Sequence, residues 1–127
     1  MERSAVTTDR IAPPVGPFSP AIRVGDTVYL SGQVAQDPAT GRLIDADVTR
    51  QTEQILKNIE AVLQAAGFSL RDVVKVGVFL TDMRDFQAMN AVYARWFEAP
   101  YPARTTVAVA ALPLEASVEI DVVARTH

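Results

Sequence analysis

The sequence contains no cysteine, a single histidine and only two lysines among its 127 residues. Without cysteine the chain has no disulfide, no thiolate nucleophile and no cysteine-ligated metal. The histidine is His127, the last residue, so we expect neither a Ser-His-Asp triad nor a multi-histidine zinc site. No Gly-rich phosphate loop accompanies Lys57 or Lys75. We therefore expect chemistry without metal or cofactor, based on carboxylates, arginine, hydroxyls, amides, backbone groups and water.

Long apolar runs and an excess of positive charge are also lacking. No apolar stretch approaches the roughly 18 residues that cross a bilayer, and the residues from Met1 to Ser4 do not begin a signal peptide. The formal net charge is −3 with acids and bases interspersed, whereas nucleic-acid-binding proteins usually carry a basic stripe. We expect a cytoplasmic protein that binds neither a membrane nor nucleic acid.

The composition is that of one folded domain. Hydrophobic residues make up 49% and charged residues 21% of the sequence, which is enough to bury a core in a chain of this length. There is no internal repeat and no low-complexity tract. Residues 1–16 have few periodic apolar positions and include Pro13-Pro14, so we expect a loosely ordered N-terminal arm within a single domain spanning 1–127.

Apolar periodicity and turn residues predict the elements. Gly25-Asp26 separates two short apolar segments as a tight hairpin turn. Asp47 is an N-cap and Gly67 a left-handed stop for the clearest helical pattern. We expect strands at Ala21–Val24, Thr27–Ser31, Val73–Leu80, Thr105–Ala110 and Val118–Val123, and helices at about Asp47–Ala66 and Asp85–Phe97.

This order, β-β-α-β-α-β-β, predicts an α+β fold in which right-handed crossovers place both helices on one face of a mixed sheet. The strand Val73–Leu80 reads as apolar on both sides, with Val74, Val76 and Val78 on one and Val73 and Phe79 on the other. Because no helix remains to cover the second face, we expect another copy of the chain to cover it. The pattern does not give the number of copies.

Two charged residues stand in apolar strands. Arg104 comes just ahead of the strand Thr105–Ala110, where partial burial would require an anionic partner such as a bound carboxylate or, more simply, an intramolecular salt bridge. Strand alternation places Glu119 on one face with Asp121 and Val123. The Glu119 carboxylate would face solvent at a sheet edge or line a pocket and act as a general base.

Weaker candidates are Asn90 and the segment Ser31-Gly32-Gln33. The Asn90 amide would donate to a ligand or satisfy a loop carbonyl. Gly32 permits close approach of a ligand or strand, although a bulge or turn explains it equally well. The aromatic residues of the second helix, among them Phe86 and Tyr93, are expected in the core.

Taken together, these segments resemble the RidA (YjgF) family along nearly the whole chain, from about Gly16 to Val123. The most specific similarity is the spaced pattern Pro102-Ala103-Arg104-Thr105-Thr106-Val107, Leu112-Pro113, Val118-Glu119-Ile120. The supporting segments are Gly16-Pro17-Phe18-Ser19-Pro20-Ala21, Val28-Tyr29-Leu30-Ser31-Gly32-Gln33, Pro38-Ala39-Thr40-Gly41 and Phe86-Gln87-Ala88-Met89-Asn90-Ala91-Val92-Tyr93.

The resemblance implies a chorismate-mutase-like subunit, three of which pack their sheets into a central barrel with clefts between subunits. It implies that Arg104 binds a substrate carboxylate and that Glu119 positions water. Around the same cleft it places Phe18, Ser31, Gly32, Asn90 and Thr106. Family members often have Tyr at the position of Phe18 and several have Cys at that of Thr106, so this chain departs there, as it does at Pro20.

The implied activity is hydrolytic deamination of reactive 2-imino acids or their enamine tautomers to 2-keto acids and ammonia. Two alternatives stay open from the sequence. One is a non-catalytic regulatory protein that binds a small metabolite such as a keto acid. The other is a dedicated catabolic deaminase of a larger enamine, for which Phe18 would provide apolar room.

Overall fold

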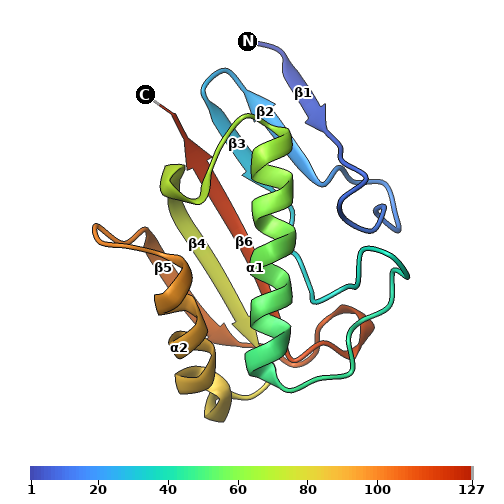
Figure 1. Ribbon diagram of the computed structural model, residues 1–127, viewed down its shortest axis with the longest axis vertical. Helices are drawn as coiled ribbons and strands as arrows, with labels where there is room; N and C mark the ends of the chain where they lie inside the picture. The colour runs from blue at the N-terminus through green and yellow to red at the C-terminus, as the bar shows by residue number, and fades with distance from the viewer. Residues whose placement is uncertain (127) are drawn as a thin grey trace.

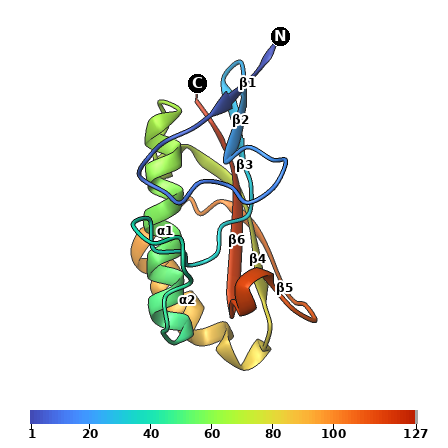
Figure 2. The ribbon, with the colours of Figure 1, turned by 90° about the vertical axis from the view of Figure 1, so that its right-hand side faces the viewer.

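The computed structural model describes residues 1–126, and His127 lies outside the described residues. A six-stranded sheet forms one layer and two α-helices form the other (Figures 1 and 2). The elements are β1 (Arg3–Val6), β2 (Ala21–Val24), β3 (Thr27–Leu30), α1 (Val48–Ala65), β4 (Val73–Leu80), α2 (Phe86–Trp96), β5 (Ala103–Ala108) and β6 (Val118–Arg125). No helix among residues 1–126 is long and apolar enough to cross a membrane.

The strand order in the sheet is β1-β2-β3-β6-β4-β5. Only β4 and β5 run parallel, and the other neighbours are antiparallel. Figure 2 shows both helices on the same side of this sheet. The mixed sheet with its helices on one face confirms the α+β fold predicted from the sequence.

The helices begin and end close to the predicted residues because their capping signals are used. The Asp47 carboxylate accepts a hydrogen bond from the Arg50 backbone N–H at 2.9 Å, which satisfies one free donor of the first turn of α1. Gly67 has φ +84° and reverses the chain after α1. The fully buried side chains of α1 are Ile55, Leu56, Ile59, Val62 and Leu63.

The prediction for β4 is wrong in one detail. The register shifts between Val73 and Lys75, so Val74 is the extra residue of a β-bulge. Val73 is therefore buried on the same side as Val76 and Val78, whereas Val74 is 49% exposed. Simple alternation placed Val74 with Val76 because it cannot anticipate an unpaired residue.

Several strand boundaries differ from the prediction, and one strand was not predicted. β5 begins two residues earlier than expected, so Arg104 lies within the strand and pairs with Val76. Residues 3–6 form β1, antiparallel to β2, instead of belonging to a loose arm. Three of the four residues of β1 are exposed, so backbone pairing at the sheet edge forms this strand without the apolar alternation that sequence reasoning uses.

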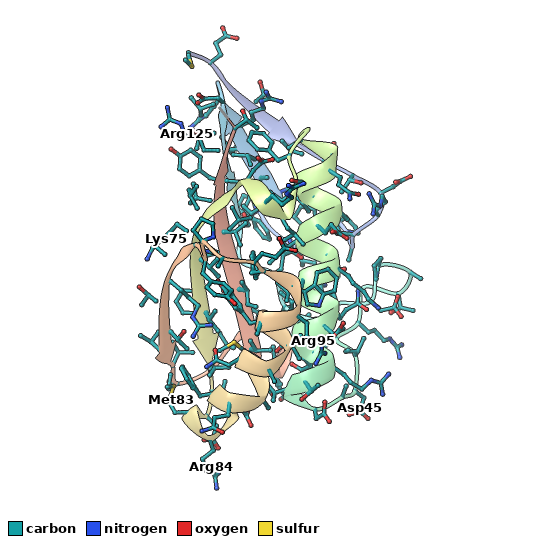
Figure 3. The ribbon with its side chains drawn as sticks, turned by 60° about the vertical axis from the view of Figure 1, so that its left-hand side comes forward. Asp45, Lys75, Met83, Arg84, Arg95 and Arg125 are labelled. Carbon is teal, nitrogen blue, oxygen red and sulfur yellow. The ribbon has the colours of Figure 1, made fainter. Side chains whose placement is uncertain are left out.

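The sheet face opposite the helices carries apolar side chains. Strand register places Tyr29 beside Val123 and Phe79 beside Val107 on this face. Tyr29 is 51% and Val107 40% exposed. Lys75 and Arg125 project from the same side, away from α1 (Figure 3). We call this surface the uncovered face.

Candidate functional site

Arg104 lies on the helix side of the sheet, beneath α2. Its guanidinium carbon is 4.6 Å from the centre of the Tyr93 ring and 5.7 Å from that of Phe86. Among residues 1–126, no salt bridge includes Arg104, so the intramolecular ion pair considered from the sequence is not found. A partly buried guanidinium held by aromatic rings, with its donors free of a carboxylate, is suited to bind an anionic ligand.

Polar atoms around Arg104 also lack partners. Among the described residues, the buried side-chain atoms without a hydrogen bond are Asn90 Oδ1, Tyr93 Oη and Thr106 Oγ1. Asn90 shares the helix face of Phe86 and Tyr93, and Thr106 follows Arg104 by two residues on β5. Buried polar atoms are normally hydrogen-bonded, so this concentration indicates a place for a polar ligand or water. Arg104, Asn90, Tyr93 and Thr106 are called the Arg104 cluster below.

The Tyr93 hydroxyl differs electrostatically from a tyrosine in solvent. Burial raises the pKa of Tyr93, and the nearby positive charge of Arg104 opposes this effect. Tyr93 was expected in the core from its place in the helical pattern, and the structure confirms that it is buried. The contact between Tyr93 and Arg104 was not predicted from the sequence. The spacing of Phe86, Asn90 and Tyr93 at i, i+4 and i+7 does indicate that these three residues share one face of α2.

Glu119 lies on the uncovered face of β6, beside Phe79 of β4. The side chain is partly buried and has neither a salt bridge nor a hydrogen bond to another residue among 1–126. Burial raises the pKa of Glu119, and the negative charge of Asp121 on the same face raises it further. An unpaired carboxylate with a raised pKa is suited to accept a proton from water.

Gly32 allows the Glu119 side chain to take this position. A Cβ atom added to Gly32 would lie 2.5 Å from Glu119 Oε2 and 2.8 Å from its Cδ. The close approach expected at Gly32 is therefore made by the Glu119 carboxylate of the same chain. Only a residue without a side chain leaves room for it.

A cavity of about 340 Å³ opens beside Glu119. Phe18, Gly32 and Glu119 line it together with apolar residues from three loops. Its residues are Ile11, Ala12, Pro14, Val15, Phe18, Pro20, Gly32, Gln33, Val34, Gln36, Pro113, Leu114 and Glu119, which together are called the Glu119 cavity. Phe18, Gly32 and Glu119 were expected at the site from the family resemblance. The other apolar lining residues were not predicted, because they lie in loops that have no hydrophobic periodicity.

Ser31 does not line the Glu119 cavity. Its hydroxyl donates to the Ser19 carbonyl at 2.6 Å, and its backbone N–H donates to the Pro20 carbonyl at 3.0 Å. Ser31 therefore fixes the loop that carries Phe18. In this chain the structure gives Ser31 a positioning contact.

The predicted site residues fall into two groups on opposite faces of the sheet. Arg104, Asn90 and Thr106 lie on the helix side, whereas Glu119, with Phe18 and Gly32 in its cavity, lies on the uncovered face. A single chain does not bring Arg104 and Glu119 into one cleft. Because β5 is the edge strand of the sheet, an adjoining copy can approach Arg104 there.

Comparison with known sequences identifies relatives over nearly the full chain. The family model described as Endoribonuclease L-PSP matches residues 8–126. A RutC family protein of Pyrococcus horikoshii is 44% identical over 122 residues, covering 96% of this chain and 97% of that protein. Reactive Intermediate Deaminase A, chloroplastic, of Arabidopsis thaliana is 42% identical over 98% of this chain and 66% of its own length. A Dermatophagoides farinae protein named 2-iminobutanoate/2-iminopropanoate deaminase is 41% identical over 95% of both chains.

Solved structures agree with this relationship. A crystal structure of a Thermotoga maritima protein described as a putative endoribonuclease has a TM-score of 0.96 and 45% identity, with 100% of this chain and 99% of that chain covered. E. coli TdcF, crystallised with bound serine, has a TM-score of 0.93 and 38% identity, with 98% and 99% covered. The family match, the identities and the shared fold place this chain in the RidA (YjgF) family.

Proposed function

We propose that this protein hydrolyses short 2-imino acids, or their enamine tautomers, to 2-keto acids and ammonia. The observation that carries the proposal is a pair of complementary charged groups, Arg104 and Glu119, each partly buried and without an ion-pair partner among residues 1–126. The names of two relatives as deaminases support the same chemistry.

Arg104 would bind the substrate carboxylate. Its planar guanidinium can donate two parallel hydrogen bonds to the carboxylate oxygens, which fixes the orientation of the adjacent C=N carbon. Tyr93 and Phe86 hold the guanidinium plane from the α2 side. The unpartnered oxygens of Asn90 and Thr106 are suited to contact the imine nitrogen or an ordered water.

Glu119 would hold the attacking water and take one of its protons as the oxygen bonds to the C=N carbon. The electron pair of the C=N double bond moves to nitrogen, which takes up the proton that Glu119 removed from water, and a tetrahedral carbinolamine with an NH2 group forms. Glu119 would then remove the proton of the carbinolamine hydroxyl and return it to this nitrogen, so that the C–N bond breaks, the C=O bond forms and ammonia leaves. Free imines already hydrolyse in water, so a carboxylate base and an oriented substrate suffice.

The complete site would lie between copies of the chain in a homotrimer. Two features support this arrangement: the apolar uncovered face, and the placement of Arg104 and Glu119 on opposite faces. An adjoining copy that packs on the uncovered face would bring its Arg104 cluster toward the Glu119 cavity. Light scattering in dilute solution should give three times the chain mass, and a monodisperse monomer at micromolar concentration would contradict this model.

The decisive experiment for activity is a coupled assay. A threonine dehydratase generates the four-carbon imino acid continuously, and release of 2-ketobutyrate is followed with and without this protein. Acceleration by wild type, and much less by Arg104→Lys, supports the proposal. If the protein binds 2-ketobutyrate and leaves its release unchanged, it is instead a metabolite-binding regulator.

A further inference from the structure

The Glu119 cavity is larger and more apolar than a three-carbon imino acid requires. Its volume of about 340 Å³ lies at the lower end of the roughly 300–1,000 Å³ typical of small-molecule sites. Most of its wall is apolar, and Ile11, Val15 and Leu114 contribute to it from two different loops. The cavity therefore offers an apolar extension next to the carboxylate that holds water.

The one charged group of the cavity does not suit a charged substrate side chain. Glu119 is the one ionisable residue in the lining, and it is assigned to water. Gln36 Nε2 already donates to the Gly41 carbonyl at 2.9 Å. The Gln33 backbone is bonded in both directions to Ile120, at 2.8 and 3.1 Å. An acidic substrate side chain would meet the Glu119 charge, and a basic one would compete with water for it.

Leu114 forms part of the cavity wall, and its backbone is in the left-handed region. It has φ 58° and ψ 22°, and Glu115 beside it has φ 59°, a region that non-glycine residues seldom occupy. Such conformations concentrate at binding sites, where the surrounding structure enforces them. Leu114 is 54% exposed and lines the cavity, so its side chain stands at the boundary with solvent, whereas Glu115 is outside the lining.

We infer that the Glu119 cavity is the side-chain subsite, and that it favours 2-imino acids with branched aliphatic side chains of about four carbons, with Leu114 as a specificity-determining residue. This inference rests on the proposed function, because it requires the imine carbon to sit beside Glu119. The side chain then points away from Arg104 into the apolar extension.

The expected preference is moderate. Each additional buried methylene is worth several-fold in binding, and a hydrophobic site discriminates between homologous substrates by about ten- to two-hundredfold. We expect kcat/KM for the leucine-derived imine to exceed that for the alanine-derived imine by at least about tenfold. The measurement uses leucine and alanine with an amino-acid oxidase and catalase, following keto-acid release above the uncatalysed rate.

The matched variants are Leu114→Ala and Glu115→Ala. Both change a residue in the left-handed conformation, and only the first removes a side chain from the cavity. Leu114→Ala should reduce the leucine-to-alanine ratio by at least about threefold, the effect of one or two methylenes, whereas Glu115→Ala should leave it unchanged. Equal ratios in all three proteins would show that Leu114 does not determine specificity.

Binding of the product keto acids separates failure of this inference from failure of the proposed function. Calorimetry compares 4-methyl-2-oxopentanoate with pyruvate on wild type. If both imines are hydrolysed with no preference, the subsite is wrong and the activity stands. If neither imine is hydrolysed faster and the branched keto acid still binds more tightly, the activity is wrong and the subsite stands. No turnover together with no binding preference would overturn both.

Discussion

The Arg104 cluster and the Glu119 cavity each accommodate a partly buried charged group, but they do so in different ways. Both contain a partly buried charged group without an ion-pair partner in the described chain. Arg104 is held by aromatic rings of α2 on the helix side of the sheet. Glu119 is accommodated by a missing side chain, at Gly32, on the uncovered face. One region fixes a cation by contact, and the other admits an anion by leaving space.

This difference bears on how the two regions would act. A guanidinium stays charged at every physiological pH, so Arg104 is suited to permanent binding of a carboxylate. A carboxylate with a raised pKa is a stronger base, so Glu119 is suited to accept a proton from water. In the proposed function, binding and chemistry would thus be divided between the faces of the sheet, and the following experiments test that division.

Glu119→Gln should have the largest effect on rate. The amide keeps the shape of the side chain and cannot accept a proton from water, and general-base catalysis contributes about 10²–10⁴-fold. We expect kcat for imine hydrolysis to fall at least about a hundredfold, with keto-acid affinity changed by less than about threefold, because in the proposed site Arg104 would bind the carboxylate. Kinetics and calorimetry on the same preparation check this, and an equal loss of affinity and rate would assign Glu119 a structural role.

The same variant should respond differently to pH. Because burial and Asp121 raise the pKa of Glu119, the native state binds its proton more tightly than the unfolded state. The free energy of unfolding therefore loses a contribution as pH rises from the ordinary glutamate pKa through the raised value. Glu119→Gln cannot ionise, so its Tm relative to that of wild type should rise as the pH increases above the ordinary glutamate pKa of about 4.3. Wild-type activity should rise over the same interval as the carboxylate forms.

Arg104→Lys should have the next largest effect and a different signature. Lysine keeps the positive charge and loses both the planar fork and the stacking over Tyr93. We expect kcat/KM to fall at least about tenfold, or about 1.4 kcal/mol of transition-state stabilisation. Keto-acid affinity should fall with it, unlike in Glu119→Gln. Unchanged kinetics with an intact oligomer would mean that Arg104 does not bind substrate.

Mixing two inactive variants tests whether the two regions work across copies. Arg104→Ala and Glu119→Gln are unfolded, combined in equal amounts and refolded together, with each refolded alone as a control. If a site takes Arg104 from one copy and Glu119 from another, random assembly should restore about a quarter of wild-type activity. If both residues act within one chain, the mixture stays as inactive as its components.

The sequence predicts the helices and the central strands because their signals are local. The Asp47 cap, the left-handed Gly67 and the apolar periodicity of α1 all act within a few residues. β1 and the bulge at Val74 depend on pairing with other strands, so local pattern could not give them. The partial burial expected of Arg104 is likewise a local inference. Whether Glu119 faces solvent or lines a pocket was left open by the sequence, and the placement of the two residues on opposite faces follows from the register of β5 and β6 across β4.

Tyr93→Phe should give the smallest effect and sharpen the description of the Arg104 cluster. The substitution removes a buried hydroxyl that has no hydrogen bond to another residue among 1–126, and it keeps the ring that packs against Arg104. A buried hydroxyl without a partner does not stabilise the protein, so Tm should stay the same or rise. If the hydroxyl contacts ligand, KM should rise about threefold with kcat unchanged, because a neutral hydrogen bond is worth about 0.5–1.5 kcal/mol.

Tyr101→Phe is the matched control, since that side chain is exposed, and it should change neither quantity. A fall in kcat for Tyr93→Phe with KM unchanged would instead place the hydroxyl at the reacting atoms.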